Sequence, residues 1–289
     1  MPSPLLLLVV VLLALHAARV AASEVGIYTL VDGEVRVLRA ASWYRLAPGV
    51  RIEDGDVVDI ASGAEAQLEW TAGGTLSADG PAQLYAAAAA PGDDRKSAPA
   101  EIVIPRGWGK VVVPSGKRPL RVRLPAGALD VANAAVVVHG DAGLAEFFVE
   151  SGVAKVYVPV TRGKEAPPQE AKAGEFWSRS GDRAFATAGS PPAAFVSAMP
   201  RQFRDPLPAL SQRFPTAHPA PPVGRDITFV EAEPWLSGPA RKSFVRRFTP
   251  RLSDPAFRAA VSAHPAAYPE WDRILHPEKY LPKPSAPSK

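Results

Sequence analysis

The sequence predicts a mainly β protein, in which a domain of short antiparallel strands, forming a sandwich or a short solenoid, precedes a proline-rich tail with short helices. Residues 25–188 contain short apolar runs, some alternating with polar residues, separated by Gly, Pro, Asn or Asp turns. Many of the 32 prolines lie in the last hundred residues, where they exclude long regular helices. We therefore divide the chain into a β-rich domain at residues 23–188 and a tail at residues 189–289.

The predicted strands are apolar runs bounded by turn residues. The clearest runs cover residues 25–31, 34–39, 65–71, 134–139, 146–149 and 153–160. Asp32-Gly33 separates the first two runs, and Ser151-Gly152 separates the last two. Each dipeptide fits a tight hairpin in which the glycine takes a positive φ angle.

The two halves of the β-rich domain resemble one another. Residues 28–37 and 147–156 each pair a predicted hairpin with a short excursion and a glycine turn into another strand. Repeated units stacked side by side would bury one continuous apolar layer, which neither unit could bury alone. Any hairpin followed by a turn has a similar pattern, so a true repeat and a chance likeness both stay open.

The tail has its own start signals for short helices. A polar N-cap or a first-turn proline is typical of a helix start, and this pattern occurs at Ser190-Pro191, Ser237-Gly238-Pro239, Asp254-Pro255 and Tyr268-Pro269.

Aromatic residues in the tail need an apolar partner. Residues 195–214 and 268–281 combine aromatics with prolines and charges, and we interpret them as clamps that hold the tail on the β-rich domain rather than as a partner-binding surface. Residues 241–248 hold four basic side chains around Phe244, Val245 and Phe248. We interpret this segment as a solvated face over buried aromatics; a basic amphipathic patch for lipid or a partner is the alternative.

The N-terminal residues predict export. An apolar run from Leu5 to Leu15 precedes small residues ending Val20-Ala21-Ala22, which fits a signal peptide at residues 1–22 with cleavage after Ala22. The run is shorter than the roughly 20 apolar residues that span a membrane, so a retained anchor is the minority alternative, and no stable membrane span is expected after cleavage. The segment before the run lacks Lys and Arg, which weakens the signal-peptide prediction.

Composition excludes several function classes. With no cysteine, the chain can form neither a disulfide nor a thiolate metal site, and it offers no lipid attachment point of the lipoprotein type. Cleavage would remove Arg19 and lower the formal net charge from +4 to +3. The remaining basic residues are spread along the chain rather than clustered in a stripe, so we do not expect a nucleic-acid partner.

No residues form a recognisable catalytic, cofactor-binding or metal-binding constellation, and we predict no cofactor. His139, His218, His264 and His276 lack metal-ligand spacing. Asp54-Gly55-Asp56 lacks the further acidic residues of a calcium loop, so we interpret it as Asx-type turn chemistry. Nucleophile-elbow, phosphate-loop and dinucleotide-binding patterns are also absent from the sequence.

The β-rich domain resembles the FecR-like domain of bacterial periplasmic proteins over most of residues 25–188. In the first half the resemblance rests on Gly33 to Val37, Trp43, Leu46, Gly49, Gly55 to Val58, Ala64 to Leu68 and Gly73 to Leu76. In the second half it rests on Val149 to Val156 and Ala173 to Glu175. Residues 86–120 fit the pattern least well.

The resemblance implies a β-rich periplasmic module that senses or binds without enzymatic activity. In well-known members a cytoplasmic anti-sigma segment and a membrane helix precede the module, whereas here the apolar run begins at Leu5. We therefore expect the module without direct cytoplasmic signalling. The predicted function is a non-enzymatic binding or scaffold module that acts in the cell envelope, in signal sensing or in envelope-protein assembly. Its expected partner is an unidentified envelope protein or glycan. The alternative is an envelope hydrolase whose site converges from scattered residues; the oligomeric state is left open.

Overall fold

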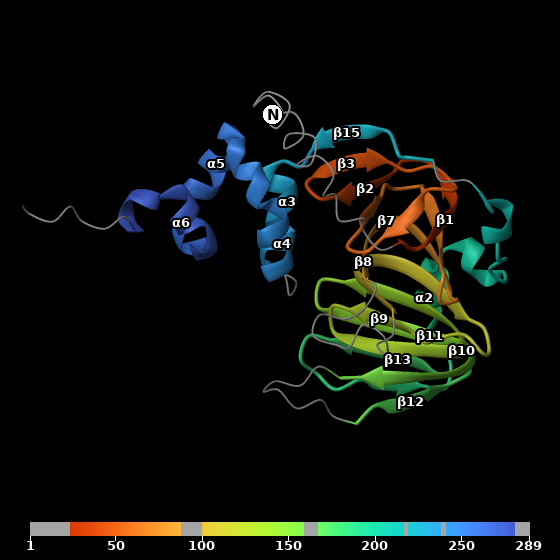
Figure 1. Ribbon diagram of the computed structural model, residues 1–289. Helices are drawn as coiled ribbons and strands as arrows, with labels where there is room; N and C mark the ends of the chain where they lie inside the picture. The colour runs from red at the N-terminus through yellow and green to blue at the C-terminus, as the bar shows by residue number, and fades with distance from the viewer. Residues whose placement is uncertain (1–23, 88–99, 159–166, 217–218, 238–240, 281–289) are drawn as a thin grey trace, which may run out of the picture.

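The computed structural model describes residues 24–87, 100–158, 167–216, 219–237 and 241–280 (Figure 1). The predicted signal peptide at residues 1–22 and its cleavage site lie outside the described residues.

Strands dominate the described part of the chain, which confirms the predicted mainly β class. The strands are β1 (Glu24–Asp32), β2 (Val35–Arg39), β3 (Ser42–Arg45), β4 (Arg51–Glu53), β5 (Val57–Ile60), β6 (Glu65–Trp70), β7 (Thr75–Ala87), β8 (Ala100–Val113), β9 (Leu120–Leu124), β10 (Gly127–Asp141), β11 (Leu144–Tyr157), β12 (Gln169–Lys172), β13 (Phe176–Ser180), β14 (Ala186–Ala188) and β15 (Val223–Asp226).

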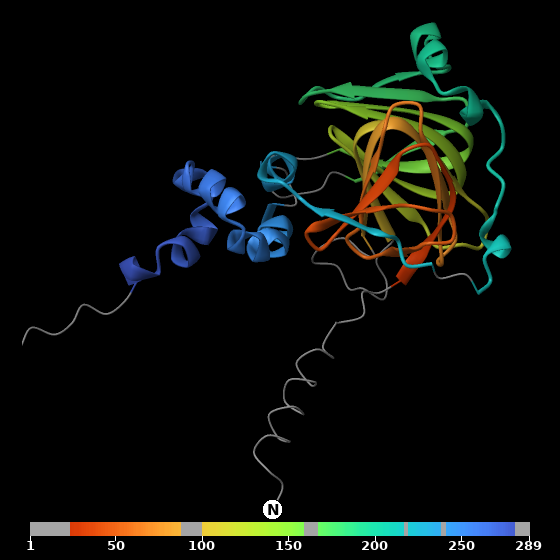
Figure 2. The same ribbon diagram turned by 90° about the horizontal axis from the view of Figure 1, so that it is seen from above.

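The strands form one continuous sheet that folds over itself into two layers, because the long strands change partners along their length. The first part of β7 pairs with β6 and its second part with β5. Likewise, β10 pairs with β9 at one end and with β8 at the other. Layer 1 then has the order β4-β1-β6-β7-β8-β10-β11-β13-β14, and layer 2 the order β15-β3-β2-β5-β7-β8-β9-β10-β11-β12. Figure 2 shows the layers curving around a common interior.

The main core lies between the two layers. Side chains alternate across each strand, so each layer contributes one apolar face. Leu68, Val136 and Phe147 of layer 1 belong to the same buried cluster as Val37 and Val122 of layer 2. The domain is therefore a sandwich, one of the two arrangements expected from the sequence.

The two predicted glycine turns have the expected backbone but not the expected role. Gly33 and Gly152 have φ angles of 76° and 77°, which confirms the positive values. The hairpin prediction was wrong, because β1 pairs with β6 while β2 pairs with β5, and Ser151-Gly152 lies inside β11. At both places the glycine marks the bend at which the chain leaves one layer for the other. A hairpin and such a bend share the same local glycine geometry.

The bends give the two halves the same pairing order. Before Gly33 the chain pairs with β6 and after it with β5. Before Gly152 the chain pairs with β13 and after it with β12. In each half, the strand that pairs with the segment before the glycine (β6 or β13) follows in sequence the strand that pairs with the segment after it (β5 or β12). This shared order supports a true internal repeat.

The tail forms short helices, and the longest described one has nine residues. They are α2 (Ala193–Ala198), α3 (Phe229–Ser237), α4 (Arg241–Phe248), α5 (Pro255–Ser262) and α6 (Asp272–Leu275). Asp254 caps α5 by accepting from the backbone N–H groups of Ala256 and Phe257, as the Asp254-Pro255 pattern predicts. The tail also supplies β15, an edge strand of layer 2 that the sequence analysis did not predict. None of these helices combines the length and apolar character needed to cross a membrane.

The tail packs on both outer faces of the sandwich. Phe195 of α2 and Phe203 join Val137 and Phe176 on layer 1. Helices α3 to α6 form a second cluster, which includes Trp43 of layer 2. Figures 1 and 2 show these helices on one side of the sandwich and α2 on the other.

The tail aromatics of the two predicted clamp segments differ in their partners, because Phe195 and Phe203 pack on layer 1, whereas Tyr268 and Trp271 contact Phe229, Phe257 and Thr249 of the tail itself. Phe195, Phe203, Tyr268 and Trp271 are all buried, whereas Tyr280 is half exposed.

The basic segment of α4 differs in part from the predicted solvated face. Phe244, Val245 and Phe248 are buried as expected. Arg247, however, lies against the sandwich and donates hydrogen bonds to the carbonyl oxygens of Leu38, Ala40 and Gly55. Burial lowers the pKa of Arg247 below its usual value. This side chain fastens α4 to the sandwich rather than facing solvent.

Candidate functional site

The histidines in the described part of the chain do not converge on a common site. His139 of β10 stacks on Trp108, with ring centroids 4.3 Å apart, and its Nδ1 lies 3.0 Å from a carboxylate oxygen of Glu146. His276 follows α6 in the helical part of the tail, and His218 lies outside the described residues. Within the described ranges, no group of three or more His, Asp or Glu side chains could hold a metal ion.

Asp56 belongs to a buried structural network. Its carboxylate accepts hydrogen bonds from Tyr28 Oη at 3.1 Å, from Arg39 at two 2.9 Å contacts, and from the Glu53 backbone N–H at 3.0 Å. Burial and the neighbouring Asp56 carboxylate raise the pKa of Tyr28 well above its usual value. Asp56 thus closes this turn backwards onto the backbone of Glu53.

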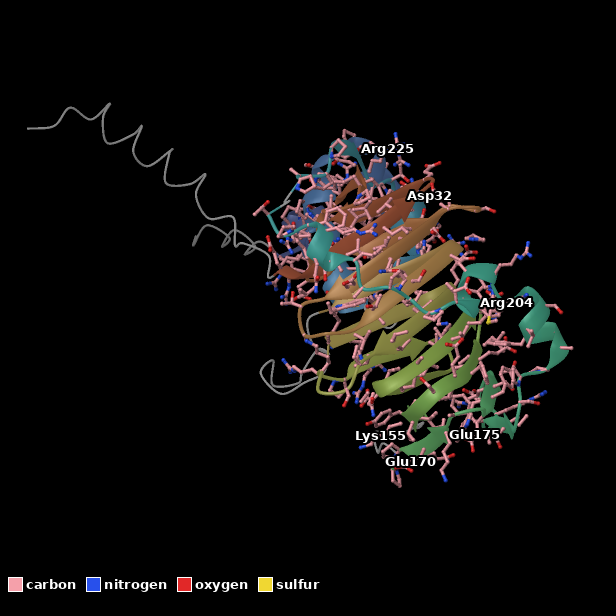
Figure 3. The ribbon with its side chains drawn as sticks, turned by 90° about the vertical axis from the view of Figure 1, so that its right-hand side faces the viewer. Asp32, Lys155, Glu170, Glu175, Arg204 and Arg225 are labelled. Carbon is pink, nitrogen blue, oxygen red and sulfur yellow. The ribbon has the colours of Figure 1, made fainter. Side chains whose placement is uncertain are left out.

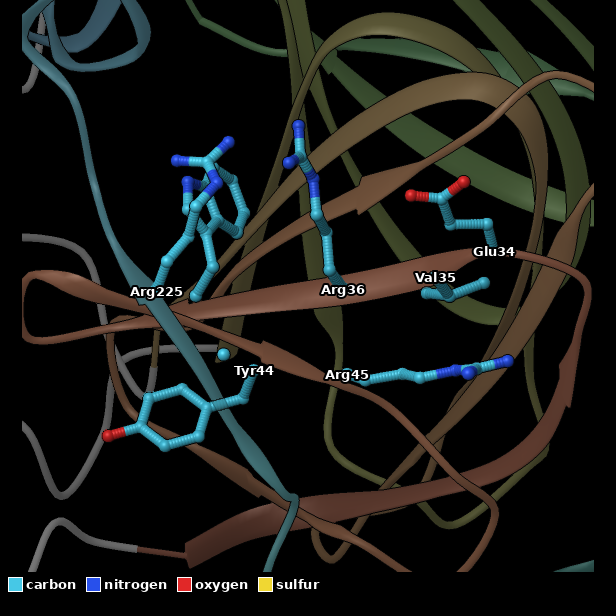
Figure 4. Close-up of a pocket in the computed structure, with 8 residues that line it drawn as sticks. Glu34, Val35, Arg36, Tyr44, Arg45 and Arg225 are labelled. Carbon is cyan, nitrogen blue, oxygen red and sulfur yellow. The ribbon is translucent and has the colours of Figure 1, made fainter.

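A surface pocket of about 370 Å³ lies where β2, β3 and β15 meet (Figure 4). Its lining consists mainly of charged and aromatic side chains from segments far apart in the sequence. The lining residues are Glu34, Val35, Arg36, Trp43, Tyr44, Arg45, Gly224 and Arg225. None of them was predicted as a site residue from the sequence.

Strand register places two of the arginines together. Arg36 of β2 lies directly opposite Arg45 of β3, and like charges in this position repel one another. Arg36 is compensated, because its Nε and Nη2 donate to Asp59 at 3.0 and 2.9 Å and its guanidinium stacks 4.3 Å from the Trp43 ring centroid. Arg45 is exposed and has no ion pair among the described residues.

Helix α3 holds Arg225, the third arginine of the pocket, in place. Thr228 and Glu231 form a capping box in which the Glu231 side chain accepts from the Thr228 backbone N–H at 3.1 Å. The same carboxylate accepts two hydrogen bonds of 2.7 Å from Arg225 and lies 3.6 Å from Arg36. The Thr228-x-x-Glu231 spacing is a helix-start signal that the sequence analysis missed. Glu231 therefore connects the helical tail with the pocket.

Glu231 should make the docking of α3 sensitive to acid. Its pKa is lowered to about 2, chiefly by the hydrogen bonds from Arg225. A depressed folded-state pKa gives stability that is present above the unfolded pKa of about 4.3 and is lost as the pH falls towards 2. We expect Glu231→Gln to be less stable than wild type at pH 7, by about 1 kcal/mol because the pair is partly exposed. The difference should shrink between pH 5 and 2 in urea unfolding; a constant difference would contradict this role.

Chemically, the pocket suits an anion. Arginine presents a planar fork of donors that matches a carboxylate or phosphate, and stacks on aromatic faces. Figure 4 shows Arg36, Arg225 and Glu34 projecting to the same side of the strands. Asp59 and Glu231 already engage Arg36 and Arg225, which leaves Arg45 as the available guanidinium.

Comparison with known proteins gives matches among the solved structures, including two from the same organism. Both are crystal structures of a proposed anti-sigma factor from Parabacteroides distasonis ATCC 8503. They share 14% and 16% sequence identity with this chain, at TM-scores of 0.38 and 0.37. The matches cover 49% of this chain, and this chain spans 62% and 63% of theirs. No protein-family model matches the chain, and no curated protein matches it either.

Proposed function

We propose that this protein is a non-enzymatic, FecR-like binding module that acts in the periplasm and engages an anionic group on an envelope protein or glycan. The observation that carries the proposal is the arginine-lined pocket over β2, β3 and β15, with Arg45 available for a ligand. The resemblance over residues 25–188 and the export signal predicted at residues 1–22 support the cellular location.

The pocket's chemistry favours binding over catalysis. General acid–base catalysis needs titratable groups positioned around the reacting atoms. The pocket has one carboxylate in its lining, Glu34, and the adjacent Asp59 and Glu231 are held by arginines. No observation in the described part of the chain favours the alternative of an envelope hydrolase.

Photocrosslinking in the periplasm tests the proposal. Glu34 is exposed and lines the pocket, so a photoreactive p-benzoyl-phenylalanine at this position should capture the bound partner. We expect a discrete adduct that falls at least fivefold in Arg45→Ala and is retained in Arg246→Ala, a substitution of an exposed arginine on α4. Sensitivity of the adduct to protease or to glycan-degrading enzymes then separates a protein partner from a glycan.

Two results of the crosslinking experiment would contradict the proposed binding site. Either no adduct at position 34, or an adduct of equal yield in the Arg45 and Arg246 variants, would remove the pocket as the binding site. Urea unfolding of both variants serves as the folding control, since exposed substitutions usually change stability by less than about 0.5 kcal/mol.

A further inference from the structure

The outer face of layer 1 carries a strip of buried polar side chains. This polar strip runs across four strands and consists of Thr29, Gln67, Glu69, Ser77 and Lys110, which are 3 to 7% exposed. By contrast, the second cluster, which joins the helices to layer 2, is apolar and includes Leu38, Trp43 and Val57. The tail therefore covers the sandwich in two chemically different ways.

An extended part of the tail covers the polar strip. We call residues 201–213 the strap; they follow α2 and contain two short 3₁₀ turns, Arg201–Arg204 and Ser211–Arg213. Figure 2 shows this part of the chain passing along the outside of the sandwich, and Figure 3 shows Arg204 near the face that it crosses.

Lys110 binds one end of the strap through its main chain. Its ammonium donates to the carbonyl oxygens of Phe203 at 2.6 Å and Asp205 at 2.8 Å, and it pairs with Glu150 at 2.8 Å. An ammonium has three donors, so these three acceptors satisfy it. Two of the three belong to the strap.

Glu69 and Gln67 bind the other end. The Glu69 carboxylate accepts from the backbone N–H groups of Leu210 at 2.6 Å and Ser211 at 3.1 Å. Burial alone would raise the pKa of Glu69, but the hydrogen bonds from the Leu210 main chain, from Ser211 and from the Thr29 side chain outweigh it, and the pKa is lowered. Gln67 Nε2 donates to the Pro208 carbonyl oxygen at 2.8 Å.

The strip thus binds the strap chiefly through main-chain groups, and two strap side chains add to this: Ser211 also bonds Glu69, and Gln202 donates to Asp79 of β7. Phe203 is the only fully buried strap side chain, and it lies with Val137, Phe176 and Phe195. The other strap side chains are exposed or partly exposed. Main-chain groups are the same in every polypeptide. A face that binds mainly these groups and one aromatic side chain can therefore bind segments of many different sequences.

The polarity of the strip limits the cost of strap release, whose hydrophobic part is confined to Phe203 and its apolar neighbours. Permanent interfaces resemble a domain core cut in half, whereas surfaces that associate and separate are more polar. Lys110 and Glu69 would regain water if the strap left, while an apolar face such as the one under the helices would be exposed at a large hydrophobic cost.

We infer that the polar strip is a binding groove for an extended, proline-containing polypeptide segment of a partner protein, and that the strap occupies this groove until the partner displaces it. The strap indicates which chemical groups a partner segment must present to the groove. Such a segment needs free carbonyl oxygens at the positions of Phe203, Asp205 and Pro208, and an aromatic side chain at the first of these. Prolines such as Pro206 and Pro208 reduce the entropy lost on binding because they pre-set an extended chain.

A peptide added in trans tests the groove in the full-length chain. The probe is a fluorescent synthetic peptide with the sequence of residues 199–214, measured by anisotropy. Phe203→Ala combined with Leu210→Pro weakens the strap by removing its anchor and one N–H donor, but leaves the groove unchanged. We expect this variant to bind the peptide at least tenfold more tightly than wild type or the exposed-site control Gln212→Ala. Adding Glu69→Gln and Lys110→Met should abolish the gain.

Hydrogen exchange of the unmodified chain gives a second test that does not depend on any variant. The amides of Leu210 and Ser211 should exchange at least tenfold faster than those of Val111 and Val136 in the sheet beneath, because the strap opens without global unfolding. Equal protection of strap and sheet would overturn the inference, as would a strap-weakened variant that fails to bind the peptide. A dimer formed by exchange of straps between two copies would also overturn it, because the occupant would then be a second copy of this chain.

Discussion

Replacing Asp56 by alanine is expected to lower the free energy of unfolding by about 3 to 5 kcal/mol, since it removes one partner of a buried ion pair. The carboxylate is 1% exposed and holds Arg39, Tyr28 and the backbone of Glu53 together. Its loss leaves the Tyr28 hydroxyl without its acceptor in the core and removes two hydrogen bonds from Arg39. Urea unfolding at pH 7 measures the effect.

Two companion variants isolate the cause of this loss. Asp56→Asn keeps the size of the side chain and one acceptor oxygen but removes the charge, so its loss should be smaller than that of Asp56→Ala. Asp182→Ala removes an exposed carboxylate from the turn after β13 and should change stability by less than about 0.5 kcal/mol. Similar losses for Asp56→Ala and Asp182→Ala would show that the buried network contributes little.

Gly152→Ala is expected to destabilise the protein by about 3 kcal/mol, through two separate causes. The φ angle of 77° costs any residue with a Cβ about 1 to 2 kcal/mol. In addition, a Cβ at this position would lie 2.1 Å from the Asn133 carbonyl oxygen and 2.8 Å from Ala134 Cα on the neighbouring strand β10. Overpacking of this kind costs about 1 to 3 kcal/mol, because the backbone must move.

Gly181→Ala is the matched control. Gly181 also has a positive φ, 59°, but a Cβ there would meet no atom within 4 Å. This variant should show the backbone cost alone and unfold at a higher urea concentration than Gly152→Ala. Equal losses in the two variants would mean that the close approach of β10 and β11 at this bend is easily relieved.

Local signals in the sequence were sufficient to predict several strands, the short tail helices and some of their ends. Turn-bounded apolar runs gave β1, β2 and β6 within one or two residues, and Asp254-Pro255 gave the start of α5. The positive φ angles at Gly33 and Gly152 were also predictable, because a tight turn with glycine is a local feature. Burial of Phe203 and Trp271 followed from the need of large aromatics for an apolar environment.

Pairing partners could not be predicted in the same way. A glycine turn fits both a hairpin and a bend between layers, and the choice depends on which distant strands offer matching edges. The segments on the two sides of Gly33 therefore pair with β6 and β5 rather than with each other. The edge strand β15 has no local signal either, since it pairs with β3 across nearly two hundred residues of sequence.

The candidate site depended even more on the tertiary structure. By itself, the sequence determined the mainly β class, the short tail helices and the glycine backbone angles, because periodicity, proline and turn chemistry act over a few residues. Only the fold brought Arg36, Arg45 and Arg225 around one pocket and laid the strap over Glu69 and Lys110. Each of these side chains is an ordinary charged residue in its local sequence. Their chemical roles depend on their neighbours in space. These neighbours are set by the register of the strands and by the return of the tail to the sandwich.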